Sequence, residues 1–185
     1  MKKYFSIPAI AVIIAGCASL GTKTLYSAGN KVEIKKLGFS NLDGASFVNR
    51  IFPKTDSIFR SAFINTTGKF NLTPPIYLEN ELSIEKPDTA LIMSMCKEKN
   101  LDGLIVSRLK FINTSYSVYL IPVGQSFDTE VEMKLFSSAG GLLFSVRYGT
   151  LKGNSYLNFP TGEKTVRDGA VGAINKIAKE FGWKK

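Results

Sequence analysis

The chain has 185 residues, of which 44% are hydrophobic and 21% charged, a balance typical of one globular domain rather than a disordered tail or a fibre. It contains no histidine, which excludes Ser-His-Asp and Cys-His nucleophile systems and imidazole metal sites. Its two cysteines, Cys17 and Cys96, are too few for a disulfide framework or a thiolate zinc cage.

The N-terminal residues have the order of a secretory signal peptide. Lys2 and Lys3 form a short basic region, and residues 4–15 are almost wholly apolar. This run is too short to cross a bilayer, which requires about 20 apolar residues. Small residues precede a cysteine at its end, in the order Ile14, Ala15, Gly16, Cys17.

Residues 14–17 resemble the bacterial lipobox. The resemblance implies cleavage before Cys17, diacylglycerol (with palmitate-type chains) on its sulfur and acylation of the new amine, and several acyl chains give stable membrane anchoring. Ala18 follows instead of Asp, and the family's sorting rule then favours the outer membrane. The alternative is an uncleaved or ordinary signal peptide with a chance cysteine. We therefore expect a signal peptide over residues 1–16, a lipidated tether over 17–30 and one domain over 31–185.

Loss of Lys2 and Lys3 would lower the net charge from +9 to +7. A positive charge can indicate a nucleic-acid partner. No run of Lys and Arg interleaved with aromatic residues occurs, and an exported protein rarely meets nucleic acid. The charge therefore favours solubility or contact with anionic envelope polymers and lipid headgroups.

The first half of the domain alternates strand and helix signals. Residues 32–39 alternate apolar and polar side chains, which predicts a strand. Thr55 or Asp56 begins a helix with one apolar face, which ends at residues 65–68. A second strand is predicted over residues 69–72, where Pro74 and Pro75 halt it, and residues 79–88 are expected to form an acidic surface loop.

The second half has the clearest periodicity. A helix is predicted over residues 88–99, with Leu91, Ile92 and Met95 facing inward. A hairpin with one polar face follows, and the last helix carries a stripe of apolar residues and ends at Gly182. The predicted segments are strands over residues 104–112, 116–123, 127–135 and 142–150, and a helix over 160–182.

These elements predict an α+β fold. One antiparallel-rich, mixed sheet of about five strands would bury its apolar face under about three helices, all packed on that one face.

The densest set of carboxylates is Asp128, Glu130 and Glu132, which a strand places on a single face. Such a set could form an acid/base pair or a hard-cation site. The opposite face of this strand is apolar, so the solvated face of a half-buried strand is the favoured interpretation. Cys96 lies in an apolar stretch and is expected to be a buried, inert thiol.

Aromatic residues near the ends of elements are candidate contacts with a protein partner, although each could equally lie in the core or on an edge strand. These residues are Tyr116, Tyr119, Tyr156 and Phe159.

Residues 31–41, 58–72 and 96–103 resemble the periplasmic domain shared by curli-secretion lipoproteins and lipoprotein activators of penicillin-binding proteins. The resemblance covers about residues 31–183 and implies a small, non-enzymatic α+β domain that works through protein contacts. Two features depart from it. The chain has no spare length for the long hairpins of the secretion channels. Its tether, residues 18–30, spans at most about 45 Å, too short to reach across the cell wall.

The sequence therefore predicts a membrane-anchored lipoprotein that serves as a binding or assembly accessory of the cell envelope, with a protein partner and without a cofactor or nucleic acid. It leaves the oligomeric state open. The alternative is a small-ligand or cation-binding protein, or a carboxylate-dependent enzyme, that uses the face of Asp128, Glu130 and Glu132.

Overall fold

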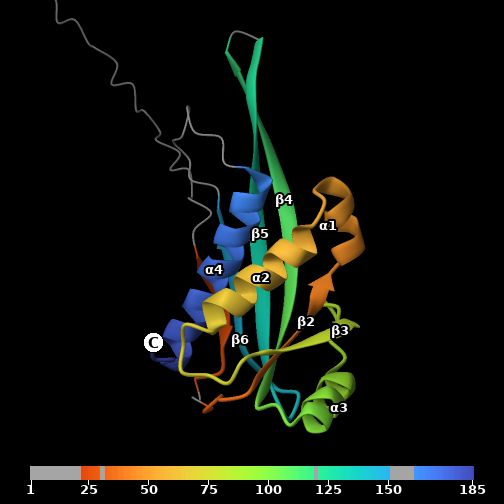
Figure 1. The fold of residues 1–185 in the computed structure, drawn as a ribbon, viewed down its shortest axis with the longest axis vertical. Coiled ribbons are helices and arrows are strands. Elements are labelled where there is room, and N and C mark those ends of the chain that lie inside the picture. The colour runs from red at the N-terminus through yellow and green to blue at the C-terminus, as the bar shows by residue number, and fades with distance from the viewer. Residues whose placement is uncertain (1–21, 30–31, 119–120, 151–160) are drawn as a thin grey trace, which may run out of the picture.

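The computed structural model describes residues 22–29, 32–118, 121–150 and 161–185, and the structural statements below concern these residues. They form one mixed six-stranded sheet, in the order β1-β6-β5-β4-β2-β3, and four helices (Figure 1). The strands are β1 (Lys23–Ser27), β2 (Leu37–Asp43), β3 (Ile76–Glu81), β4 (Gly103–Val118), β5 (Ile121–Ser137) and β6 (Leu142–Gly149). The helices are α1 (Ala45–Ile51), α2 (Thr55–Thr67), α3 (Thr89–Lys99) and α4 (Gly162–Phe181).

The α+β class and the mixed sheet are confirmed, but the element count exceeds the prediction. The additional strand, β1, lies within the segment that we expected to be a tether, and Lys23 pairs with Arg147 of β6. All five of its residues are exposed, so it has no apolar face for a pattern to reveal. The additional helix, α1, follows Gly44, whose φ of 77° lies in the left-handed region that favours glycine.

Two predicted strands are displaced along the chain. The first begins at Leu37 rather than at residue 32, and residues 69–72 lie outside any strand. Phe70 is buried because it packs against the indole of Trp183, with ring centroids 6.0 Å apart, so its burial reflects the loop and not a sheet. The strand begins instead after Pro75 and includes residues 79–81, which we expected in a loop.

Helices α2 and α4 cover one face of the sheet, which faces the viewer in Figure 1. Phe63 of α2 stacks on Phe39 of β2 with ring centroids 4.2 Å apart. On α4, a Cβ at Gly172 would lie 2.3 Å from the ring of Tyr148, so glycine allows this helix to approach β6. The predicted apolar stripe of α4 is buried. None of the helices in the described segments is long and apolar enough to span a bilayer.

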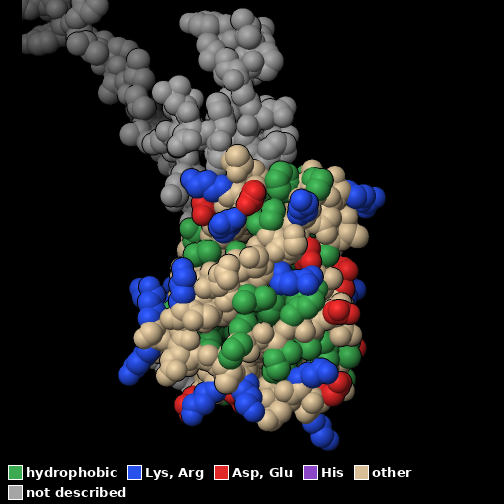
Figure 2. Space-filling model, viewed as in Figure 1, with side chains coloured by type: hydrophobic (Ala, Val, Ile, Leu, Met, Phe, Trp, Pro, Cys, Tyr) green, Lys and Arg blue, Asp and Glu red, His purple; other side chains and the backbone are tan. Residues whose placement is uncertain are grey.

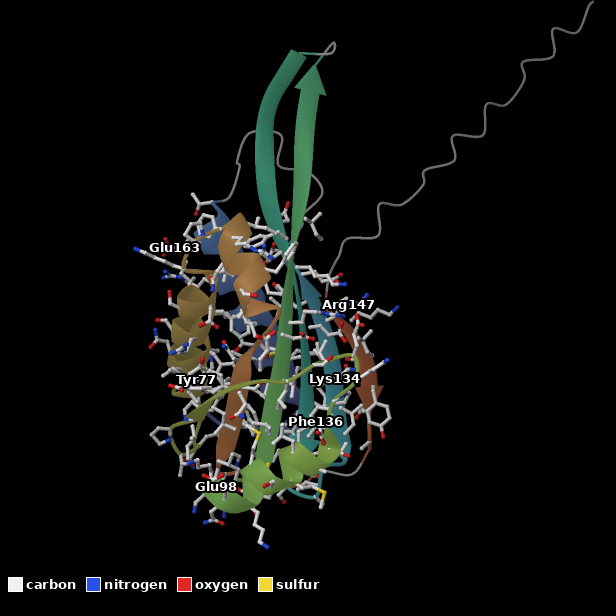
Figure 3. The ribbon with its side chains drawn as sticks, turned by 90° about the vertical axis from the view of Figure 1, so that its right-hand side faces the viewer. Tyr77, Glu98, Lys134, Phe136, Arg147 and Glu163 are labelled. Atoms are coloured by element: carbon white, nitrogen blue, oxygen red, sulfur yellow. The ribbon has the colours of Figure 1, made fainter. Side chains whose placement is uncertain are left out.

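Helix α3 covers the opposite face, so the prediction that all helices share one face is wrong. Alternate residues of β4 and β5, including Leu104, Val106 and Phe136, form a second core with Ile92 of α3. Figure 3 shows Phe136 on this rear side of the sheet, away from α2. Leu91, which we expected to face inward, is 37% exposed. The lower half of the central strands is thus buried on both faces.

The hairpin of β4 and β5 extends far beyond the rest of the sheet (Figure 1). β4 has 16 residues and β5 has 17. Within the described residues, β2 pairs with β4 only as far as Arg108, and β6 pairs with β5 only from Glu130. Beyond these positions the two strands pair only with each other. The expectation that the chain had no length for a long hairpin is therefore wrong.

The two-sided core generates a direct test. Ile92→Ala should lower the free energy of unfolding by about 2–5 kcal/mol, because it leaves a cavity in the rear core. Leu91→Ala is the matched control on the same helix and should cost less than about 1 kcal/mol. Urea unfolding measures both changes. Equal losses would mean that α3 does not pack on the sheet by this face.

Candidate functional site

The three predicted carboxylates lie on the rear face of β5, as the period-two spacing required. Asp128 and Glu132 are buried, at 3% and 8% exposure, while Glu130 is partly buried. The face is therefore not the solvated surface that we favoured from sequence. Two arginines from neighbouring strands lie beside Glu130 and Glu132.

Glu132 lies between Arg108 of β4 and Arg147 of β6. Its Oε2 is 3.4 Å from Nη2 of each arginine, and both contacts join residues that are direct cross-strand neighbours. Arg147 also approaches Glu130, with Nε 3.5 Å from Oε1. Figure 3 shows Arg147 on the rear side, above Lys134. We call this set, Arg108, Glu130, Glu132 and Arg147, the rear charge row.

A fifth group covers the row from the segment before α3. Arg108 donates a hydrogen bond to Glu85, and Lys134 Nζ donates to the carbonyl of Ile84 at 2.7 Å. Burial disfavours the charge of Arg108, but the hydrogen bond to Glu85 and the charges of Glu132 and Glu85 outweigh it and raise the pKa of the guanidinium. The hydrogen bond from Arg108 and its charge lower the pKa of Glu85.

This arrangement compensates the carboxylates with side-chain cations. Arginine guanidinium groups lie where a bound cation would have to lie, and their charge opposes one. Within the described residues, no group of three or more His, Cys, Asp or Glu side chains is placed to hold a metal ion. In this geometry the ion pairs of Glu130 and Glu132 join β4, β5 and β6.

Asp128 belongs to a separate set of contacts near the base of the hairpin. The hydroxyl of Thr150 lies 3.4 Å from its Oδ1 and also accepts a hydrogen bond from the backbone N–H of Thr129 at 2.9 Å. The hydroxyl of Thr129 in turn donates to the carbonyl of Thr165 on α4 at 2.7 Å. These bonds join β5, the end of β6 and α4, so this carboxylate too is part of the framework.

Cys96 is buried in the rear core at 1% exposure, as expected. Burial raises the pKa of its thiol, which disfavours the reactive thiolate.

The predicted anchor and most of the predicted partner contacts lie outside the described residues. These are Ile14, Ala15, Gly16, Cys17, Tyr119, Tyr156 and Phe159. The backbone of Tyr116 lies in β4, opposite Gly124, but its side chain is not described.

Sequence reasoning missed an apolar surface on α1. Phe47 is 58% exposed and Ile51 is 45% exposed, and they lie four residues apart on one side of the helix. The guanidinium of Arg50 lies 5.8 Å from the centroid of the Phe47 ring. The available signal was the helical spacing of these apolar residues, but a helix of seven residues is too short for the spacing to repeat.

Neither the family models nor the curated proteins yield a match to this chain. The fold does match solved structures. PelC from Paraburkholderia phytofirmans, described as a dodecamer, aligns with a TM-score of 0.55 at 12% identity, over 89% of this chain and 98% of that one. A Leu-to-Met variant of that dodecamer aligns with a TM-score of 0.50 at 12% identity, over 82% and 97%.

A lipoprotein from Neisseria meningitidis, GNA1162, aligns with a TM-score of only 0.28 at 13% identity, over 79% of this chain and 95% of that one. At these identities the PelC alignments establish a shared fold, and it includes nearly the whole PelC chain.

The rear charge row predicts unequal costs for its two glutamates. Glu132→Gln should lower the free energy of unfolding by about 2–3 kcal/mol, because it removes the buried carboxylate that pairs with both Arg108 and Arg147. Glu130→Gln, at the same strand face, should cost less than about 1 kcal/mol, because its partner Arg147 is 40% exposed. Chemical denaturation measures both. A larger loss for Glu130→Gln would contradict the central place of Glu132.

Proposed function

We propose that this chain is a bacterial lipoprotein that Cys17 anchors to a membrane, and that it acts without catalysis, by assembling with copies of itself and with other envelope proteins. The observation that carries the proposal is the coincidence, in one chain, of a lipobox-like segment with a fold that matches a dodecameric protein along 98% of its length.

The anchor is supported by the sequence and by where the described domain begins. Residues 14–17 have the lipobox order, and the first strand begins at Lys23, only six residues after Cys17. The acyl chains would therefore hold the domain close to the membrane surface. The sorting residue Ala18 favours the outer membrane.

Assembly is supported by three surfaces of the domain. The fold neighbour is a dodecamer, which makes self-association a reasonable property for this fold. The edge strands β1 and β3 are mostly exposed, and such edges offer unpaired backbone groups to a neighbour. Phe47 and Ile51 add exposed apolar side chains near the base of the hairpin.

A catalytic or cation-binding alternative would use the carboxylates of β5. Glu132 and Glu130 already pair with arginines, and Asp128 contributes to the framework bonds, so this alternative receives no support from the site. The variant Glu130→Gln should fold. Under our proposal it should keep the same ability as the wild type to assemble with its own copies and with other envelope proteins. Loss of function in that folded variant would favour the alternative.

The anchor can be tested with the two cysteines of the chain. Mass spectrometry of the protein extracted from bacterial membranes should find acyl chains on an N-terminal Cys17, and labelling with palmitate should be lost in Cys17→Ser. Cys96→Ser is the control and should keep the label, because that thiol is buried. An unmodified Cys17 in the wild-type chain would disprove the anchor.

The assembly can be tested by native mass spectrometry of the detergent-extracted protein. The wild type should form a defined oligomer, and Phe47→Ser with Ile51→Ser should shift it to smaller species, because it removes apolar area from the contact. Ile64→Ser is a control of similar exposure, at 41%, on α2. A monomeric wild type, or equal effects of both variants, would contradict assembly through α1.

A further inference from the structure

A groove runs between the outer surfaces of α2 and α4, the two helices that cover the front of the sheet. It encloses 370 Å³, within the size range of small-ligand sites. Figure 2 shows this face of the molecule, with uncharged polar surface (tan) along α2. The groove is separate from the rear charge row and from the exposed residues of α1. We call it the α2–α4 groove, and its defining residues are Ser57, Ser61, Asn65, Lys69, Arg167 and Val171.

One wall of the groove is a row of polar side chains at a four-residue spacing. Ser57, Ser61 and Asn65 follow one another on α2, and Lys69 continues the spacing just after the helix ends. Because an α-helix rises 1.5 Å per residue, the row is about 18 Å long. All four side chains are exposed. This length suits an extended chain better than a compact ligand.

The row keeps hydrogen-bonding groups for such a ligand. Nδ2 of Asn65 donates to the hydroxyl oxygen of Ser61 at 3.4 Å, which leaves the second amide hydrogen and the amide carbonyl of Asn65 unused. Ser61 donates no hydrogen bond within the described chain. The hydroxyl of Ser57 donates to the carbonyl of Lys54 at 2.9 Å but can still accept a bond. Three less exposed residues of the groove are apolar: Ile58, Ala62 and Val171.

The charged residues that line the groove are both cations. Lys69 is exposed and forms no ion pair with the described residues. Nη2 of Arg167 lies 2.7 Å from Oε1 of Glu163, but the two side chains are 58% and 54% exposed, so the pair is weak and other guanidinium N–H groups stay available. A recess beside α3, in contrast, includes the carboxylate of Asp102. The α2–α4 groove therefore suits an anion.

A saccharide chain fits this groove better than a peptide. An extended peptide binds by pairing with a free strand edge, but both walls of the groove are helices, whose backbone groups bond within the helix. A helical peptide needs a groove that accepts large apolar anchors, and this one is lined mostly by polar side chains. A saccharide presents hydroxyl groups along an extended chain, and serine and asparagine can both donate to them and accept from them.

We propose that the α2–α4 groove binds an acidic polysaccharide. Lys69 and Arg167 pair with carboxylates of the polymer, and the serine and asparagine side chains of the row bond its hydroxyl groups. The net charge of the chain, +9, attracts such a polymer to the protein. This binding goes beyond the assembly proposed above and depends neither on the lipid anchor nor on the oligomeric state.

Oligogalacturonate and oligomannuronate are defined probes, because their methyl esters are matched uncharged ligands. Isothermal titration calorimetry of the detergent-extracted full chain should detect binding of at least one acid, and its ester should bind about tenfold more weakly. High salt should weaken binding of the acid, since it screens the attraction. Oligoglutamate of equal charge should also bind about tenfold more weakly, because it lacks hydroxyl groups.

Two pairs of charge variants separate the groove from net charge. Lys69→Gln with Arg167→Gln should weaken binding of the acid about tenfold, because both carboxylate contacts are lost. Lys86→Gln with Lys97→Gln is the control, which removes the same charge from exposed lysines outside the groove. It should change the affinity less than about twofold.

Ser61→Ala with Asn65→Ala tests the polar row without a change of charge. It should weaken binding of the acid and of its ester by a similar factor of about five, because both ligands have the hydroxyl groups. All the substituted side chains of the groove are exposed, so the variants should fold, and urea unfolding checks this.

Several results would overturn the inference. These are absence of binding to both acids, equal binding of an acid and its ester, and equal losses in the groove pair and the control pair. Oligoglutamate that binds as tightly as the acids, with the same loss in the groove pair, would assign the groove to an acidic peptide. A monomeric chain, or one with an unmodified Cys17, that still binds an acid through the groove would refute only the proposals made above.

Discussion

The pairing of β4 with β5 is the interaction on which the rest of the structure depends. Its register runs without a break from Gly103 opposite Ser137 to Tyr116 opposite Gly124. Because side chains alternate across a strand, this register sends Ile105 and Leu135 to the front core and Leu104 and Phe136 to the rear core. A slip of β5 by one residue would exchange the faces of Leu135 and Phe136 and would turn Glu130 and Glu132 toward α4.

The rear charge row adds to the definition of that register. Glu132 can meet Arg108 and Arg147 together only when all three residues stand in line across β4, β5 and β6. Burying these charges costs desolvation, so the row is weak evidence for net stability. Its consequence is specificity, because any other alignment would leave a charge on the rear face without a partner.

The parts of the fold that sequence could predict are those with a repeated apolar signal. The stripe of α4, the helix over residues 88–99 and the alternation of β5 all have this signal, and both helices form near their predicted bounds, while β5 begins six residues earlier, at Ile121. Edge strand β1 lacks the signal because all its side chains are exposed, and only backbone pairing with β6 defines it. The two-sided burial of β4 was hidden because Leu104, Ile105 and Val106 form a continuous apolar run, which does not say what covers each face.

The candidate site shows the same contrast between features that local spacing predicts and features that only contacts between distant segments determine. The shared face of Asp128, Glu130 and Glu132 follows from spacing along one strand, and it was correctly predicted. Their arginine partners come from β4 and β6, so they depend on pairings between distant segments that the local pattern does not contain.

The position of β1 links the N-terminal segment of this chain to the protection of one sheet edge. β1 is short, pairs with β6 alone among the described strands, and is the first described strand after the lipobox-like segment. A mechanical load on the N-terminus would reach this strand before any other and could peel it from the sheet. Its detachment would expose the backbone edge of β6 with which it pairs. An exposed strand edge of this kind can pair with other chains and cause aggregation. β1 therefore also protects the sheet from aggregation.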